Sequence, residues 1–384
     1  MSLLHWVWLG LAVQPGSPLT DRILERFPDP EEFFLAGKSG IDEVGKVSDS
    51  DELRIRATTL DMAKKALERA EDYGAKVLSR NSELFPRRLL EIENCPSVLY
   101  VLGDESCLNN LPAIAVVGTR RITEYGRKLT DIIAGGLGAA GAVVVSGMAE
   151  GVDSAAHKAC LAAGGKTVAV QGCGICNTYP SENLELKELI AANGAVISEF
   201  APDAEPQSSF FLIRNRIVSG LSLGVCVVEA AARSGTSVTA RLAESQGRRV
   251  FAVPADVCRS TSKGTLRLLK EGALPVGSAE DILGEYAADY GEYIDLSKIA
   301  KLGLPKVETE PEPKEPPAVT KKPLPDGVSK KAAALYALVD ATPRFADELS
   351  VNAGLSAAES AAALTELEIY GLIRSVPGRR FVIA

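Results

Sequence analysis

Two neighbouring arginines after a short apolar run are the first residues whose types and spacing suggest chemistry. The run Ile114–Val117 is followed by Gly118, Thr119, Arg120 and Arg121. A guanidinium presents a planar fork of N–H donors that matches phosphate, and a helix starting after the loop adds a positive dipole end. The stretch therefore predicts an anion site, with phosphate as the expected anion. The alternative is that both arginines are ordinary surface charges.

A second pair of cations follows two aromatic residues further along the chain. The residues in order are Phe210, Phe211, Leu212, Ile213, Arg214, Asn215 and Arg216. Positive charge neutralises phosphates and an exposed ring stacks on an unpaired base, so this combination favours a single-stranded nucleic acid. The alternative is a helix whose apolar positions face the core, namely Ile213, Ile217 and Leu221.

Three further loops, each at the end of a predicted strand, contain glycine residues or residues with hydroxyl or aromatic side chains. They contain Gly147, then Gly172 and Gly174 with Tyr179, and finally the turn Ser234-Gly235-Thr236. Glycine lets the backbone approach a ligand closely. A Ser-Gly-Thr turn at a helix N-terminus predicts another anion-binding site. The ring of Tyr179 either stacks on a base or packs beside Pro180.

Asp153 and His157 are the two residues that most resemble an acid–base pair. Their i, i+4 spacing places both on one face of a helix. We expect a buried, hydrogen-bonded structural pair, because no nucleophile is spaced with them. An acid–base role is the alternative.

The first loop also argues against the common nucleotide cofactors. A dinucleotide site needs G-x-G-x-x-G after its first strand and an acidic residue at the end of the next. This chain has Gly118 alone and then Ser146-Gly147, and it has no G-x-x-x-x-G-K-[ST] motif. Two histidines and one CxxC, Cys173–Cys176, do not make zinc spacing. We therefore expect no cofactor, no metal and no catalytic residue.

Alternating apolar runs and helical segments must position these loops. The runs are Ile114–Val117, Ala142–Val145, Thr167–Val170, Ala195–Ser198, Val225–Val228, Val250–Val253 and a weak Leu274–Val276. They predict an α/β fold with an extended, parallel, Rossmann-like sheet over residues 76–298. Lys76–Leu78 and Val98–Leu102 would extend this sheet at an edge. Because the candidate loops follow strand carboxyl ends, we expect them to meet at one rim.

Smaller segments flank this sheet. Residues 1–75 contain short apolar clusters separated by Pro and Gly, which predicts a small all-α domain with a last helix over Ser50–Tyr73. Residues 299–329 are rich in Pro, Glu and Lys and predict a linker. Residues 330–384 fit a winged helix, but Ala346 to Ile373 contains no Lys or Arg. An acidic helix repels phosphate, so protein contact or a degenerate role is expected there, and DNA contact is the alternative.

Composition restricts the class of protein. The chain has 384 residues and a formal net charge of −8, so any nucleic-acid site must be a local patch. Seven scattered cysteines suit a reducing cytosol. The apolar N-terminus is too short to span a membrane. We therefore expect a cytoplasmic protein with no membrane partner.

Together these motifs resemble the DprA/Smf family of bacterial DNA-processing proteins. The similarity runs through VGTRR (Val117–Arg121), SGMAEGVDSAAH (Ser146–His157), RNRIVSGLS (Arg214–Ser222), VVEAAARSGTSVTA (Val227–Ala240) and VFAVPADV (Val250–Val257). A small helical, SAM-like N-terminal domain and a winged-helix C-terminal domain also occur in members of this family.

The resemblance implies a non-enzymatic recombination mediator. Such a protein binds and protects single-stranded DNA, forms a homodimer through its Rossmann-like domain, and loads a RecA-type recombinase during natural transformation (competence). By motif, Arg120 matches a loop arginine that touches DNA, and Phe211 matches the aromatic residue before RNR. The predicted DNA-binding set is Gly118, Thr119, Arg120, Arg121, Gly147, Phe210, Phe211, Arg214, Asn215, Arg216, Ser234, Gly235 and Thr236.

An enzyme is the alternative function. A Rossmann-like nucleotide phosphoribohydrolase of the LOG family is suggested by the Ser234-Gly235-Thr236 turn near Glu229. That family typically has PGGxGT followed by a carboxylate, and the double glycine and this spacing are missing here.

Overall fold

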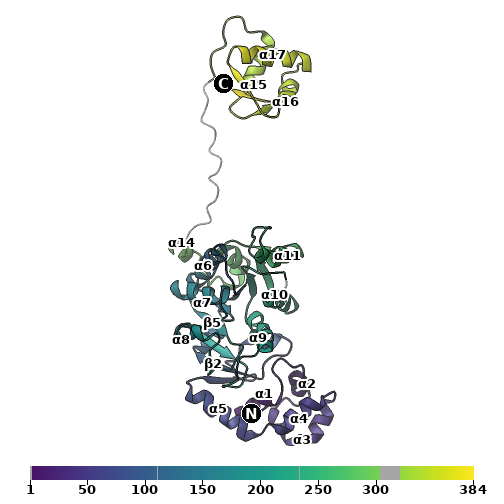
Figure 1. The fold of residues 1–384 in the computed structure, drawn as a ribbon, viewed down its shortest axis with the longest axis vertical. Coiled ribbons are helices and arrows are strands. Elements are labelled where there is room, and N and C mark those ends of the chain that lie inside the picture. Colours follow the sequence, from purple (N-terminus) through teal and green to yellow (C-terminus); the bar gives the residue numbers. More distant parts are fainter. Residues whose placement is uncertain (1, 110, 233, 303–320) are drawn as a thin grey trace. The chain divides into compact units, whose positions relative to one another are not determined.

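One nine-stranded sheet organises the first part of the chain (Figure 1). The computed structural model describes residues 2–109, 111–232, 234–302 and 321–384. The chain divides into two units, Met1–Pro305 and Lys306–Ala384. The linker expected over residues 299–329 falls largely on residues that the structure does not describe.

Parallel strands form the centre of the sheet. They are β3 (Ala113–Val117), β4 (Val143–Ser146), β5 (Thr167–Val170), β6 (Ala195–Ser198), β7 (Gly224–Val227), β8 (Arg249–Ala252) and β9 (Leu274–Pro275). The spatial order is β1-β2-β6-β5-β4-β3-β7-β8-β9. The chain winds from β3 outwards to β6 and returns to β7 beside β3, where Ala115 pairs with Val225. The α/β prediction is confirmed, and the winding order switches between β3 and β7.

Two antiparallel strands extend one edge, at the positions that the sequence predicted. β1 (Lys76–Ser79) pairs with β2 (Val98–Gly103), and β2 pairs with β6.

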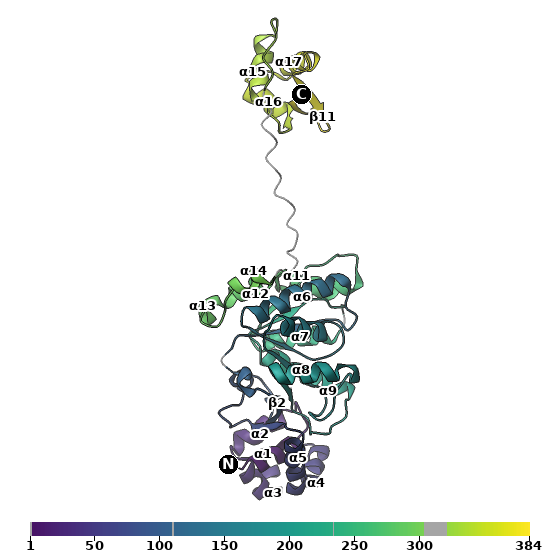
Figure 2. The ribbon, with the colours of Figure 1, turned by 90° about the vertical axis from the view of Figure 1, so that its left-hand side faces the viewer.

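Helices cover both faces of the sheet (Figures 1 and 2). One face carries α6 (Glu124–Ala139), α7 (Val152–Ala162) and α8 (Leu184–Asn193), followed by the short helices α12 (Ala279–Leu283), α13 (Ala287–Tyr290) and α14 (Ser297–Lys301). The other carries α9 (Ser208–Gly220), α10 (Gly235–Ser245) and α11 (Lys263–Glu271). Strand side chains alternate between the two layers. Ile114 and Val116 belong to the core with α6 and α7, whereas Ala115 and Val117 belong to the core with α9 and α10.

Five helices precede the sheet and gather at its β1–β2 edge (Figure 2). They are α1 (Leu3–Ala12), α2 (Leu19–Arg26), α3 (Pro30–Val44), α4 (Asp49–Ala57) and α5 (Leu60–Asp72). Trp8 of α1 and Tyr100 of β2 lie in the same hydrophobic cluster. The N-terminal helices and the sheet therefore share one continuous core.

The single helix expected over Ser50–Tyr73 is wrong, because the chain breaks between α4 and α5. The Thr59 side chain accepts a hydrogen bond from Met62 N at 3.3 Å and so caps α5. The Thr58 carbonyl accepts a bond from Trp8 Nε1 at 2.9 Å. Threonine hydroxyls favour caps over helix interiors, which explains where the break falls.

The second unit is a winged helix, as predicted. It contains α15 (Lys330–Leu338), β10 (Arg344–Phe345), α16 (Ala346–Asn352), α17 (Ala357–Ile369), β11 (Ile373–Val376) and β12 (Arg380–Ile383). Strand β12 lies between β10 and β11. Leu335, Leu349 and Leu367 belong to a core of its own. In the described ranges, no helix of either unit has the length and apolar character that crossing a bilayer requires.

Candidate nucleic-acid interface

A hollow of about 480 Å³ lies at the carboxyl ends of β3, β4 and β7, where the winding order of the sheet switches. Most of the predicted DNA-binding residues line it. They are Gly118, Thr119, Arg120, Gly147, Phe211, Arg214, Asn215, Ser234, Gly235 and Thr236. The strand–loop–helix arrangement thus brings together residues that are far apart in the sequence, as expected for this class of sheet.

Arg120 carries an exposed guanidinium at this hollow. Its Cζ lies 5.6 Å from the centre of the Phe211 ring, a cation–π arrangement. Backbone hydrogen bonds hold the Arg120 loop in place: Thr119 N donates to Glu229 O at 2.8 Å, and Val152 N donates to Thr119 O at 3.2 Å. Within the described residues, no carboxylate forms an ion pair with Arg120. Its positive charge is therefore available to an anion.

Phe211 and Tyr179 form an aromatic pair beside Arg120. Their ring centres are 5.0 Å apart with planes at 44°, and 39% of Tyr179 is exposed. Gly172 makes room for this pair, since a Cβ there would lie 2.6 Å from Phe211 Cδ1. A free cation beside an exposed ring can hold a phosphate and stack a base. Tyr179 lay outside the predicted set, although its place in a strand-end loop marked it as a candidate for stacking.

A buried lysine anchors the loop that carries Tyr179. Lys187 of α8 is only 1% exposed. Its Nζ donates to Ile175 O at 2.5 Å, to Asn177 O at 2.8 Å and to Tyr73 Oη at 3.1 Å. Burial lowers the pKa of Lys187 to about 8. The sequence did not indicate this anchor, because neither the spacing nor the type of Lys187 marks it as inward-facing.

Arg214 is a buried cation in the wall of the hollow. Its Nη1 donates to Gly147 O at 2.7 Å and also to Val170 O, so it ties together the ends of β4 and β5. Gly147 is needed here, because a Cβ would lie 2.6 Å from Arg214 Cζ. Burial lowers the pKa of Arg214, and the nearby Asp153 carboxylate opposes that shift. Arg214 therefore acts as a scaffold and places a positive charge behind the exposed Arg120.

The first turn of α10 forms another wall. Ser234 Oγ accepts a bond from Ser237 N at 3.3 Å and caps the helix. Thr236 Oγ1 donates to Gly118 O at 3.1 Å, and Asn215 Nδ2 donates to Gly235 O at 3.5 Å. The predicted anion seat at this helix N-terminus is thus bonded both to the Arg120 loop and to α9.

Three predicted residues do not line this hollow. Arg121 is exposed and is not part of the lining. Phe210 stacks on Phe200, with ring centres 4.2 Å apart. The expectation for Arg216 needs correction: its Nη1 and Nη2 bond the two carboxylate oxygens of Glu199 at 2.9 and 2.6 Å, and both side chains are buried. Arg216 therefore forms a core ion pair instead of offering its charge to DNA.

The carboxylate of Glu229 is committed to the start of α6. It accepts bonds from Thr123 N at 2.9 Å and from Thr123 Oγ1 at 2.7 Å. Thr123 is the N-cap of that helix, so the negative charge also lies at the favourable end of the helix dipole. Glu229 therefore has a structural role beside the hollow.

The expected hydrogen bond between Asp153 and His157 is wrong. His157 Nδ1 instead lies 2.7 Å from Thr167 Oγ1, whose hydroxyl donates to Val144 O at 2.7 Å. Burial lowers the pKa of His157 to about 3 and raises that of Asp153. His157 is thus neutral near pH 7 and holds strands in place. The described residues also contain no cluster of His, Cys, Asp and Glu suited to a metal ion.

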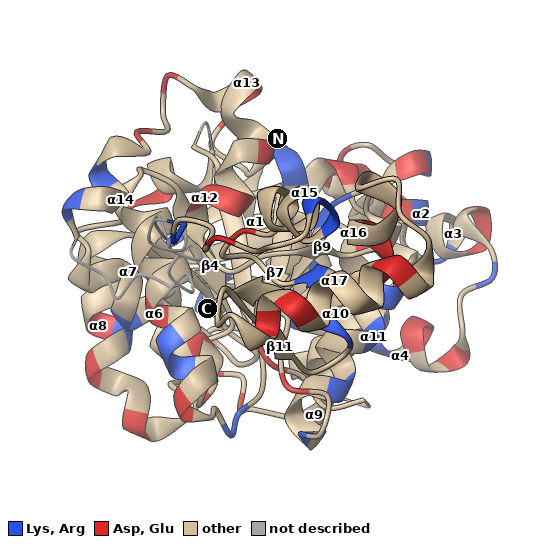
Figure 3. Ribbon diagram, turned by 90° about the horizontal axis from the view of Figure 1, so that it is seen from above, with Lys and Arg blue, Asp and Glu red and all other residues tan. Residues whose placement is uncertain are grey.

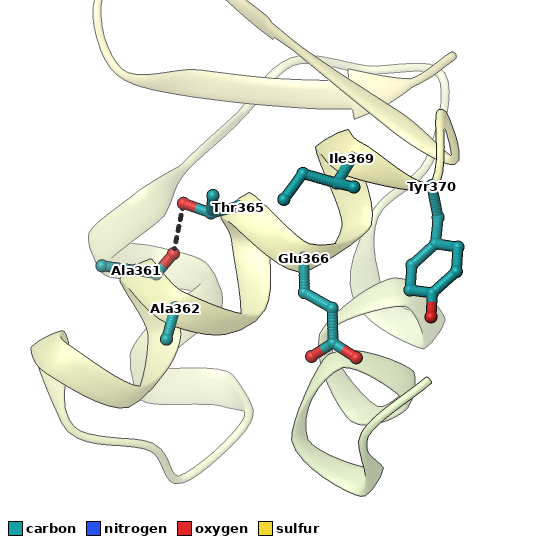
Figure 4. Close-up of a pocket in the computed structure, with 6 residues that line it drawn as sticks. All are labelled: Ala361, Ala362, Thr365, Glu366, Ile369 and Tyr370. Carbon is teal, nitrogen blue, oxygen red and sulfur yellow. Dashed lines mark hydrogen bonds between the residues drawn. The ribbon is translucent and has the colours of Figure 1, made fainter. Parts of the chain in front are cut away.

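The winged-helix unit presents a different kind of surface. Along α17 there is an open hollow lined by Ala361, Ala362, Thr365, Glu366, Ile369 and Tyr370 (Figure 4). Ile369 is 79% exposed. Helices α16 and α17 carry Asp and Glu but no Lys or Arg (Figure 3). Such a helix is poorly matched to phosphates, so the Arg120 hollow is the better candidate for nucleic acid.

Comparisons with known proteins point to one family. The sequence profile of DNA recombination-mediator protein A matches residues 76–287, and that of the DprA winged helix domain matches residues 313–379. Protein Smf of Synechocystis sp. is 32% identical over 329 residues, which cover 82% of each protein. DNA processing protein DprA of Streptococcus pneumoniae is 40% identical over 204 residues, or 53% of this chain and 72% of that protein.

Two solved structures share the fold. The X-ray structure of DprA from Streptococcus pneumoniae aligns with a TM-score of 0.66 at 32% identity, covering 74% of this chain and 99% of that one. A Helicobacter pylori DNA processing protein A, described for its unique single-stranded DNA binding mode, aligns with a TM-score of 0.52 at 32% identity. The alignment covers 56% of this chain and 97% of that one. Fold, motifs and relatives agree, and this chain belongs to the DprA/Smf family of DNA recombination-mediator proteins.

Proposed function

We propose that the hollow beside Arg120 binds single-stranded DNA. The observation that carries this proposal is the Arg120 guanidinium, which has no ion-pair partner among the described residues and lies 5.6 Å from the centre of the Phe211 ring. The cation would hold a backbone phosphate, while the exposed face of the Phe211–Tyr179 pair would stack a base. Stacking needs an unpaired base, so single strands are expected to bind more tightly than duplex.

The family supports a role in DNA recombination. The Helicobacter pylori relative binds single-stranded DNA, and the matching profile is that of a recombination mediator. We infer that this chain protects single-stranded DNA and delivers it to a RecA-type recombinase, acting as a homodimer through its Rossmann-like domain. A formal net charge of −8 fits this role, because a local basic site on an acidic protein limits non-specific DNA binding.

The hydrolase alternative, suggested by the Ser234-Gly235-Thr236 turn near Glu229, is less well supported. Glu229 lies near the Ser234-Gly235-Thr236 turn in sequence, but its carboxylate is bonded to Thr123 at the start of α6. We therefore favour binding without catalysis.

Two parallel assays test this function. Fluorescence anisotropy with a labelled oligonucleotide should show saturable binding. Incubation of the same preparation with nucleoside monophosphates should release no free base. Release of base in proportion to protein concentration, or a lack of oligonucleotide binding, would refute the proposal.

A further inference from the structure

A second hollow in the first unit, beside the Arg120 hollow, lies between the N-terminal helices and the β6–α9 connection. Its volume is about 290 Å³, and its wall combines Gly10, Leu11, Gln14 and Pro15 near the end of α1, Arg54 of α4, and Phe200, Ala201, Ala204, Gln207, Ser209 and Phe210 from the connection and the start of α9. None of these residues lines the Arg120 hollow, although Phe210 belongs to the predicted DNA-binding set.

Most polar side-chain groups around this second hollow have no hydrogen-bond partner among the residues that the structure describes. Arg54 is exposed, and its Nε donates to Leu11 O at 3.3 Å. Its two terminal nitrogens have no partner in the described part of the chain, and the side chains of Gln14, Gln207 and Ser209 also have none there. Asp203, an acidic residue in the same connection, is held by Arg69 at 2.9 Å. The positive charge of Arg54 is therefore open to an external anion.

An ordered aromatic ring forms one side of the same hollow. Phe210 stacks on Phe200 with ring centres 4.2 Å apart and planes at 16°. Phe200 is 2% exposed, so it fixes the half-buried Phe210 ring in place. A fixed ring next to amide groups and a guanidinium suits a nucleotide, because the ring can stack on a base, the amides can bond its edge, and the guanidinium can bind phosphate.

The two hollows adjoin across the first turn of α9. Ser208 and Phe211 line the Arg120 hollow, whereas Ser209 and Phe210 line the second one. Because consecutive Cα atoms are about 3.8 Å apart, a DNA strand that leaves the Arg120 hollow has only this turn to cross before it reaches the second hollow. A single strand has that flexibility, since its neighbouring bases need not remain stacked on one another.

We propose that the hollow lined by Arg54 and Phe210 is a second subsite for the same single-stranded DNA. It takes one nucleobase beside Phe210, and Arg54 neutralises a phosphate next to that base. This inference rests on the proposed function of the Arg120 hollow. It also gives the N-terminal helices a role in binding, because two of them supply part of the wall.

Oligonucleotide length is the variable that tests this subsite. Full-length protein is titrated with oligothymidylates of about 4 to 16 nucleotides, the range of site sizes known for single-strand grooves. Arg54→Ala should match the wild type on the shortest oligonucleotides that bind. On longer ones it should lose affinity, and the slope of log K against log salt should fall by about 0.7, the contribution of one phosphate. Gln207→Ala should give a smaller loss, also confined to long oligonucleotides.

Arg56→Ala is the matched control. Arg56 lies on the same helix, is similarly exposed, and is paired with Glu52 at 2.5 Å, so its removal should leave all these affinities unchanged. Loss of affinity by Arg54→Ala at every length, or at no length, would overturn the second subsite while the Arg120 site stands. A wild-type protein that binds no oligonucleotide would refute both.

Discussion

Replacement of Arg120 by alanine should weaken single-stranded DNA binding while leaving the fold intact. The side chain is exposed, and within the described residues it has no ion-pair partner, so the free energy of unfolding should change by no more than about 0.5 kcal/mol. A hydrogen bond from a charged group contributes about 1.5–3 kcal/mol. Because about 1.4 kcal/mol is a factor of ten, the Kd should rise about 10- to 150-fold at low salt.

Salt dependence identifies the contact as one to phosphate. Each phosphate neutralised on a single strand contributes about 0.7 to the slope of log K against log salt, so Arg120→Ala should lower that slope by about 0.7. Arg120→Lys retains the charge and should keep the slope, but it should recover only part of the affinity because an ammonium is a point donor. Lys65→Ala removes an exposed charge that is paired with Asp61 on α5, and it should change neither quantity.

Anisotropy titrations between about 50 and 200 mM salt, together with thermal melting of the same variants, measure both effects. A lower Tm with an unchanged salt slope would refute the phosphate contact, since that result would make Arg120 a structural residue.

Phe211, the winged helix, the Arg216–Glu199 pair and the buried Lys187 each allow a separate test. Phe211→Ala should weaken binding of single strands by about 1–3 kcal/mol in the same anisotropy assay, the loss expected for one stacked base. A chain ending at Leu302 retains the core residue Ile299 and should bind nearly as well as the whole chain, whereas a large loss of affinity would assign binding to the winged helix. Arg216→Ala should destabilise the fold by about 3–5 kcal/mol in chemical denaturation, because Glu199 is left buried and unpaired; changing both residues to apolar ones should recover much of this loss. Burial lowers the pKa of Lys187 from 10.5 to about 8. Between these two pH values unfolding is coupled to the uptake of one proton, so the free energy of unfolding should rise with pH in this range. In Lys187→Met this rise should disappear.

Much of the fold followed from apolar periodicity. Runs such as Ile114–Val117 and Thr167–Val170 predicted strands that the structure places within one residue, because strands buried on both faces need continuous apolar side chains. Helical spacing does not decide burial in the same way. Tyr125 lies one helical turn before the buried Leu129 on α6, yet it is 41% exposed and its hydroxyl donates to Pro254 O.

Most of the residues that follow strand ends meet at one hollow, as expected, whereas neighbouring residues of α9 separate. Side chains one or two positions apart on a helix do not share a face. Phe210 and Phe211 therefore line different hollows, and Arg214 and Arg216 have different partners. Helical spacing alone could have separated these pairs. It could not have shown that Glu199 receives Arg216, because that pairing depends on how the β6–α9 connection folds back.

The affinity of the whole protein for a single-stranded oligonucleotide, compared with a duplex of the same sequence at the same salt concentration, tests the central claim most directly. Wild-type protein should prefer the single strand, and Phe211→Ala should reduce this preference by lowering single-strand affinity, because the ring stacks only on an unpaired base. Equal affinity of the wild type for both forms, unaffected by Phe211→Ala, would contradict the account.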